Sequence, residues 1–287
     1  MRSDGSRSIR YPLTSLRSHP GKAWKASGKK LAGGNGNNKA PLGLRSFNSL
    51  ISGKRIASMT TSYTYPVDAI LLLGPTGVGK SPLGDALAQN GLFNRHCHHL
   101  DFGSELRHAL SDRSRSAAYS TAELDFIQGV LEQGLLLENE HFSLARKIIS
   151  LFLDRVRFSQ NEVLILNGIP RHQGQARDVA SLADVRALVV LECSSDDVVC
   201  RIRNNIGGDR STRLDDHAEM IRTKLVTFRE RTAPLIEQYE QLGRPIYHLA
   251  VTGTMTPAEA YHRLSMLAAA HPPVTFIAKP PQRRVRF

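Results

Sequence analysis

The stretch that most constrains the fold is GPTGVGKS at residues 74–81, which follows the apolar run AILLL at 69–73. It matches the phosphate-binding pattern G-x-x-x-x-G-K-[ST] and lies between a predicted strand and a predicted helix. Its glycines permit backbone conformations that a Cβ would block, so that the loop N–H groups can surround an anion. Lys80 then reaches the outer phosphates, and Ser81 can place its hydroxyl on Mg²⁺. The motif predicts a nucleoside triphosphate site formed by Gly74, Pro75, Thr76, Gly77, Val78, Gly79, Lys80 and Ser81.

Short apolar runs alternate with helix-like segments between residues 68 and 270. This alternation predicts a three-layer α/β/α fold, in which helices cover both faces of a five-stranded parallel sheet. Pro234 should kink or restart a long helix at 216–242, and Thr256, Pro257 and Glu259 form a start signal for the last helix. The expected strands are 69–73, 96–101, 162–167, 186–193 and 245–251; the other expected helices are 82–90, 103–113, 121–133, 139–157 and 195–205.

The positive charge of the chain is concentrated at its beginning. Residues 1–65 hold twelve of the 38 Lys and Arg residues but only one of the 26 Asp and Glu residues. We expect a disordered basic leader at 1–64, because this segment is also rich in Gly and Ser. Three interpretations stay open: translation that truly starts at Met59, an organellar transit segment, or a tail that binds nucleic acid or anionic lipid.

The remaining sequence is typical of one globular domain, which we expect at 65–270, with a loose Pro- and Arg-containing tail at 271–287. No apolar run reaches 18 residues, so we expect no membrane span. Three cysteines without paired spacing fit a reducing compartment. We therefore expect a cytoplasmic protein, or an organellar one if the leader is a transit segment.

Two arginines indicate a second anion site. Arg107 lies about one turn into the helix that follows the strand ending at Asp101, and Arg171 follows the turn Asn167-Gly168 after a buried strand. Ligands of open α/β folds bind at the carboxyl ends of the strands, and a guanidinium group matches phosphate oxygens. Two phosphates at one edge would suit phosphoryl transfer, which needs positioning and positive charge more than covalent chemistry.

Four stretches together resemble the adenylate kinase and UMP/CMP kinase family of nucleoside monophosphate kinases, over residues 68–268. NGIPRHQGQA resembles the family pattern D-G-F-P-R-x-x-x-Q-A, FGSELR resembles T-G-D-x-L-R, and EQGLLLENE resembles G-x-L-V-x-D. TRLDDHAEMIRTKLVTFRERTAPLIEQY resembles G-R-x-D-D-N followed by K-R-L and T-x-P-L-I. The resemblance implies a P-loop kinase with a helical insertion for the acceptor nucleoside monophosphate (NMP) at about 96–157 and a short lid at about 204–216.

The resemblance also implies roles for single residues. Lys80, Arg171 and Arg213 would act on the transferring phosphoryl group. ATP would contact the phosphate loop, with its adenine near Arg201 and Gly253. The acceptor would be bound by Phe102, Arg107, Leu136, Leu137, Gly168, Arg171 and Gln175.

The chain departs from the family pattern near the expected metal. The aspartate that opens D-G-F-P-R is Asn167 here, and the aspartate of T-G-D is Ser104. An amide offers an oxygen but no charge to attract Mg²⁺. Of the neighbouring acids Asp101 and Glu105, we favour Asp101 as the replacement, and we expect it to form the metal site with Ser81.

Three further positions limit the expected chemistry. Phe102 replaces a hydroxyl residue near the acceptor base, so the acceptor need not be AMP. Lys224 replaces an arginine and either faces the phosphates or is solvated. In the run HCHH at 96–99, His96 and His98 should point away from Cys97 and His99, since alternate strand residues face opposite sides. We therefore expect polar packing there rather than four converging ligands.

These observations favour ATP- and Mg²⁺-dependent phosphoryl transfer to a nucleoside monophosphate, either AMP or UMP/CMP. Two alternatives stay open: a P-loop kinase for a non-nucleotide small molecule, and a catalytically weakened ATP-binding protein with a regulatory or RNA-associated role. We expect nucleotide substrates as the partners, no nucleic acid or membrane partner for the folded domain, and, from the resemblance, a monomer.

Overall fold

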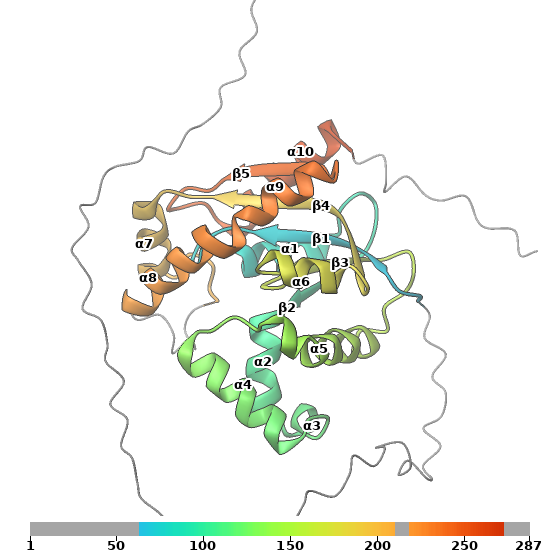
Figure 1. The fold of residues 1–287 in the computed structure, drawn as a ribbon. Coiled ribbons are helices and arrows are strands. Elements are labelled where there is room, and N and C mark those ends of the chain that lie inside the picture. Colours follow the sequence, from blue (N-terminus) through green and yellow to red (C-terminus); the bar gives the residue numbers. More distant parts are fainter. Residues whose placement is uncertain (1–62, 210–217, 273–287) are drawn as a thin grey trace, which may run out of the picture. The chain divides into compact units, whose positions relative to one another are not determined.

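A computed structural model describes residues 63–209 and 218–272 of the chain. Five strands form one parallel sheet in the order β2-β3-β1-β4-β5 (Figure 1). The fold class predicted from the sequence is confirmed, and each expected strand is found with ends that agree within three residues. The strands are β1 (Val67–Leu73), β2 (Cys97–Asp101), β3 (Val163–Asn167), β4 (Ala183–Glu192) and β5 (Ile246–Ala250).

Most of the expected helices are present, and the start signal at Thr256 is confirmed. The Thr256 hydroxyl accepts from the N–H of Glu259, and the Glu259 carboxylate accepts from the N–H of Thr256. The helices that match the expected ones are α1 (Lys80–Asn90), α2 (Phe102–Ser111), α4 (Thr121–Gln133), α5 (Phe142–Arg155), α7 (Ser195–Arg203) and α10 (Pro257–Ala270).

Two short helices were not expected from the sequence, α3 (Arg113–Ser116) and α6 (Gln173–Val179). The start of the helix expected at 139–157 is a 3₁₀ turn, η1 (Asn139–His141). The first turn of α6 is capped by His172, whose side chain accepts from the N–H of Gln175 at 3.2 Å. Histidine is not among the strongly preferred N-cap residues. The segment therefore carries no recognisable start signal in its sequence.

The long helix expected at 216–242 is interrupted before Pro234. It consists of α8 (Ala218–Thr227), a π-helical turn η2 (Phe228–Thr232) and α9 (Pro234–Gln241). Ala233 donates its N–H to the carbonyl of Phe228, five residues back, at 2.8 Å. Pro234 then starts α9, where its missing N–H leaves no intrahelical bond unmade. The predicted restart at this proline is confirmed.

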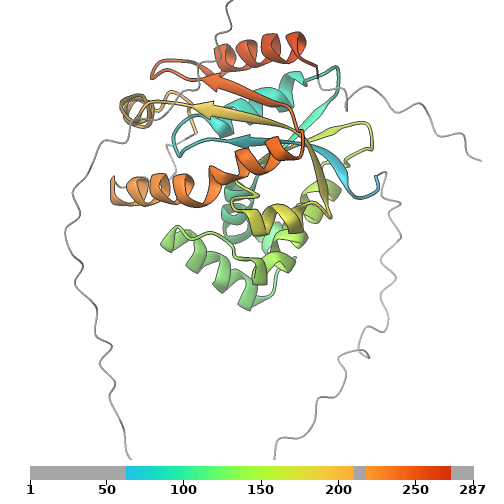
Figure 2. The same cartoon turned by 45° about the horizontal axis from the view of Figure 1, so that its top comes forward.

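Alternate residues of β1 belong to two separate hydrophobic cores. Ala69 and Leu71 face one core with buried residues of α2, α4, α5, α6 and α9. Ile70 and Leu72 face the other core, which is shared with α1 and α10. Figure 2 shows α10 and α1 on one face of the sheet and α6 and α9 on the other.

The strand register brings three chain segments together at the carboxyl edge of the sheet. Asn167 of β3 pairs with Leu72 of β1 on one side and with Asp101 of β2 on the other. The phosphate loop begins directly after Leu73. The loop, Asp101 and Asn167 therefore lie at one level, although they are far apart in the sequence.

Some sequence-based predictions fall outside the described ranges. They concern residues 1–62 of the expected leader, residues 210–216 of the expected lid, which include Arg213, and the tail from residue 273. Among the helices of 63–209 and 218–272, none has the length and apolar character needed to cross a membrane.

Candidate active site

The phosphate loop joins β1 to α1 and is packed tightly against α7. Gly79 precedes α1 with a φ of 104°, and a Cβ there would lie 2.9 Å from Nη2 of Arg201. Only glycine combines this backbone conformation with this close approach. The Nζ of Lys80 donates to the carbonyls of Gly74 and Pro75, both at 2.8 Å. Charged phosphate oxygens would bind the ammonium group more strongly than these neutral acceptors do.

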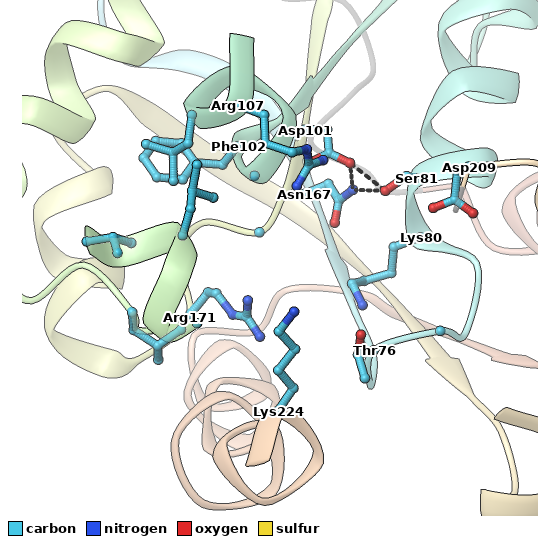
Figure 3. A pocket seen from close by; sticks show the side chains of 18 of the residues that line it. Thr76, Lys80, Ser81, Asp101, Phe102, Arg107, Asn167, Arg171, Asp209 and Lys224 are labelled. Carbon is cyan, nitrogen blue, oxygen red and sulfur yellow. Dashed lines mark hydrogen bonds between the residues drawn. The ribbon is translucent and has the colours of Figure 1, made fainter. Parts of the chain in front are cut away.

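An oxygen-rich cluster lies next to the loop (Figure 3). Ser81 donates its hydroxyl to Oδ2 of Asp101, and Nδ2 of Asn167 donates to both of these oxygens at 3.1 Å. The other carboxylate oxygen of Asp101 accepts the N–H of Ser104 at 2.9 Å and so caps α2. A hydroxyl and a carboxylate converging beside a phosphate loop are ligands of the kind that Mg²⁺ prefers, and the cluster therefore fits that ion.

Four cationic side chains face the same pocket. Lys80, Arg107, Arg171 and Lys224 all line it, and Figure 3 shows their charged ends directed into it. Burial lowers the pKa of Arg171, while the charge of Asp101 acts in the opposite direction. An arginine keeps its proton despite such a shift. The two arginines expected to bind a second phosphate thus lie in the same pocket as the phosphate loop, and Lys224 lines this pocket as well.

The backbone of Arg171 is fixed by neighbouring polar side chains. Its N–H donates to Oε1 of Gln175 at 2.7 Å, and its carbonyl accepts from the hydroxyl of Thr232 at 2.8 Å. Nε2 of Gln175 donates to the carbonyl of Leu137, also at 2.7 Å. Gln175 is 3% exposed. Its two hydrogen bonds hold Arg171 and the Leu137 segment together, in addition to any contact with an acceptor base.

Apolar side chains form the wall of the pocket on the side of the helical insertion. Gly168, with a φ of 87°, turns the chain after β3, and a Cβ there would lie 3.5 Å from Cβ of Phe102. This wall is suited to a flat apolar group attached to a phosphate, such as a base. It is formed by Phe102, Leu106, Val130, Leu131, Leu135, Leu136 and Leu137.

Arg201 links the phosphate loop to the turn between β5 and α10. It is 4% exposed, and its Nη1 donates to the carbonyls of Thr252 at 2.8 Å and Met255 at 2.7 Å. Burial lowers its pKa. Gly253, in the same turn, donates its N–H to Oδ1 of Asp197 at 2.7 Å. The expected contacts of Arg201 and Gly253 with adenine stay predictions.

The structure adds residues to the site that the sequence did not single out. Leu106, Val130 and Asp209 line the pocket and were not expected there. The helical periodicity of α2 and α4 could have indicated the apolar pair, because it places Leu106 and Val130 on the buried faces. Nothing in the sequence around Asp209 indicates its position.

A parallel sheet with a lysine-bearing phosphate loop and a second group of cations at the same edge defines a P-loop kinase. An adenylate kinase from Deinococcus radiodurans is 31% identical over 205 residues, which cover 68% of this chain and 93% of that protein. The chain belongs to the adenylate kinase family. An adenylate kinase from Thermus thermophilus is 28% identical over 201 residues, covering 68% and 94% of the two chains.

The other comparisons add no detail about the substrate. UMP-CMP kinase 1 of Oryza sativa subsp. japonica is 24% identical over 180 residues, covering 62% of this chain and 65% of that protein. No family profile of known proteins matches the chain. A gluconokinase structure from Sinorhizobium meliloti 1021 has 15% identity and a TM-score of 0.38 over 72% of this chain and 97% of the other. This similarity is too low to bear on the substrate.

Proposed function

We propose that the protein transfers the terminal phosphoryl group of ATP to a nucleoside monophosphate. The observation that carries the proposal is the composition of one pocket. The pocket has the phosphate loop with Lys80 at one end, Arg107 and Arg171 opposite it, and an apolar wall beside the arginines. This arrangement matches a donor triphosphate, an acceptor phosphate and an acceptor base.

The charge of the pocket supports an acceptor that is itself a phosphate. Among the described residues, the four cations named above and the buried Arg201 line it, together with two carboxylates, Asp101 and Asp209. An unphosphorylated acceptor would need no arginine pair, but it would need a group that removes its hydroxyl proton. A monophosphate oxygen is already anionic, so positioning and charge neutralisation are sufficient.

Mg²⁺ would be held by Ser81 and Asp101, where it would neutralise charge on the donor phosphates. The carboxylate then comes from the end of β2, whereas the equivalent of the family's D-G-F-P-R aspartate at the end of β3 is Asn167. Asn167 supports Asp101 by donating to it. This exchange of positions supports a working metal site despite the two missing aspartates.

The test measures ADP formation from ATP and Mg²⁺ with a panel of nucleoside monophosphates and with unphosphorylated polyols. We expect turnover that depends on a monophosphate. Lys80→Ala should abolish it, and Arg171→Ala should raise the KM for the acceptor. Arg177→Ala, at an exposed position of α6, is the matched control and should change neither. Turnover with polyols alone would refute the proposal in favour of a different small-molecule kinase.

One result would favour the weakened ATP-binding protein instead. Asn167 and Ser104 leave the site with fewer carboxylates than the family pattern has, which favours slow transfer. If the protein binds ATP and yet no monophosphate on the panel accepts a phosphoryl group, this second candidate replaces the first.

A further inference from the structure

A second cluster of metal-ligating side chains lies at the opposite, amino-terminal edge of the sheet. His96 directly precedes β2, His98 lies within β2, and Glu162 directly precedes β3. One ligand atom from each of these three residues lies within 4.8 Å of the other two. Asp101 lies five residues after His96 along the extended chain, so this cluster is about 16 Å from the phosphate site.

The strand register explains why these three side chains meet. Cys97 pairs with Val163, and both face the core shared with α1 and α10. Residues on either side of such a pair point to the opposite face. The N–H of Val163 donates to the carbonyl of His96 at 2.9 Å and fixes the level of Glu162 beside it.

The predicted divergence within HCHH is confirmed. His99 pairs with Asp85 of α1 at 2.8 Å, whereas His98 packs on Phe158, in the core on the other face, with ring centroids 5.5 Å apart. The prediction of polar packing considered only the run 96–99. It did not include Glu162, which the neighbouring strand supplies.

Contacts between the three side chains, and one hydrogen bond from Ser159, fix the positions of the cluster residues. The rings of His96 and His98 form an edge-to-face pair with centroids 4.6 Å apart. Nε2 of His98 lies 3.0 Å from Oε2 of Glu162, but this buried nitrogen has no aligned hydrogen-bond acceptor among the described residues. The N–H of Ser159 donates to the same Glu162 oxygen at 2.6 Å.

The carboxylate of Glu162 is charged under ordinary conditions. Burial opposes its ionisation, but the Ser159 N–H and His98 outweigh burial and hold the pKa of Glu162 below its usual range. The cluster thus combines two imidazoles with an anchored anionic oxygen. This ligand set suits zinc and neighbouring divalent metals, because imidazole binds these ions well and one carboxylate offsets part of their charge.

We propose that His96, His98 and Glu162 form a binding site for a divalent transition metal, for which Zn²⁺ is the best match. Three protein ligands leave a fourth tetrahedral position for water. The bound ion links the start of β2 to the start of β3, and it takes no part in phosphoryl transfer at the other edge of the sheet.

The chain contains a natural comparison for this site. Nδ1 of His248 in β5 lies 2.8 Å from Oε1 of Glu192 in β4, and the two side chains are 54% and 36% exposed. Among the described residues, no third ligand completes a group there. If proximity of one His and one Glu were sufficient, both places would bind metal; the proposal requires that only the three-residue cluster does.

The test uses the full chain after treatment with a chelator. Zn²⁺ binding is measured by calorimetry, and Co²⁺ is used as a probe whose visible absorption reports a tetrahedral site. We expect one equivalent of metal in the parent protein and a higher thermal unfolding midpoint when Zn²⁺ is present. His96→Ala and Glu162→Gln should weaken binding by at least about tenfold, by analogy with the 10- to 100-fold effects of groups that merely support metal ligands, whereas His248→Ala should leave it unchanged.

Two results would overturn the proposal. One is the absence of stoichiometric binding in the parent protein. The other is binding that is equally strong in the His96→Ala and Glu162→Gln variants, which would place the ion elsewhere. Glu162→Gln keeps the size of the side chain and an oxygen for the Ser159 N–H, so that loss of binding in this variant reports lost ligation and not misfolding.

Discussion

Exchanging Asn167 for aspartate would test the description of the oxygen-rich cluster most directly. In the protein, Nδ2 of Asn167 donates to Oδ2 of Asp101 at 3.1 Å. Asn167→Asp replaces this donor with a second carboxylate oxygen at nearly the same place. Two like charges would then face each other at the buried end of β3.

The size of the effect follows from two competing responses. Two unit charges separated by the observed 3.1 Å repel by about 5 kcal/mol at an effective dielectric constant of about 20. The pair can avoid this repulsion by binding one proton, which at pH 7 costs about 4 kcal/mol for a carboxyl group with an ordinary pKa near 3.9. The smaller value sets the expected loss of unfolding free energy, about 4 kcal/mol at pH 7.

The pH dependence has a definite sign. The shared proton raises the pKa of one carboxyl in the folded state, so the folded variant binds more protons than the unfolded chain does. Its stability relative to the parent protein therefore falls as pH rises, by about 1.4 kcal/mol per unit between about pH 4 and pH 7. Mg²⁺ with ATP should reduce the loss of unfolding free energy in the variant, because a cation beside the two carboxylates offsets their charge.

The assay is urea unfolding of the parent and the variant at pH 5 and pH 7, with and without Mg²⁺ and ATP. We expect a deficit near 1.5 kcal/mol at pH 5 and near 4 kcal/mol at pH 7. Asn94→Asp makes the same chemical change at an exposed turn and serves as the control. The reasoning fails if the deficit of Asn167→Asp is the same at both pH values or no larger than that of the control.

Three further substitutions test other parts of the structure. Arg171→Lys keeps the charge but loses the planar fork, so the acceptor KM should rise about tenfold with little change in the KM for ATP; an unchanged acceptor KM in steady-state kinetics would contradict the placement of Arg171. Glu138→Gln removes a half-exposed ion pair with Arg231 and should lower the unfolding free energy by about 0.5 kcal/mol. Because Arg231 lowers the pKa of Glu138, this difference should be present at neutral pH and disappear as pH falls below about 4, and a difference that persists in acid would exclude the mechanism. Thr256→Ala should cost about 1 kcal/mol in urea unfolding through loss of the α10 cap, while Thr254→Ala in the same turn should have little effect.

Strongly local signals made most of the fold predictable from the sequence. The strands are short apolar runs, the phosphate loop is a fixed motif, and α10 has a complete capping box. Where the local signal is absent, the prediction fails: α6 begins at a histidine cap. Pro234 indicated that a helix restarts there, but nothing in the sequence indicated the π-helical turn before it.

The site was less predictable, since it depends on pairings between distant segments. Strand ends at Asp101 and Asn167 were evident, but their direct contact follows from the order of β2 and β3 in the sheet. The same limit applies at the other edge, where Glu162 meets His96 and His98 only because these two strands are neighbours. The burial of Arg201 beneath the loop likewise depends on how α7 packs.

The division of β1 between two cores has a consequence for the two ends of the pocket. The helix that follows the phosphate loop rests on the core reached by Ile70 and Leu72, and the helices around the acceptor wall rest on the core reached by Leu71. The phosphate loop and the apolar wall are therefore supported by separate packing layers that share only the sheet between them. Substitutions in one core can change one end of the pocket while the packing beneath the other end stays as it is.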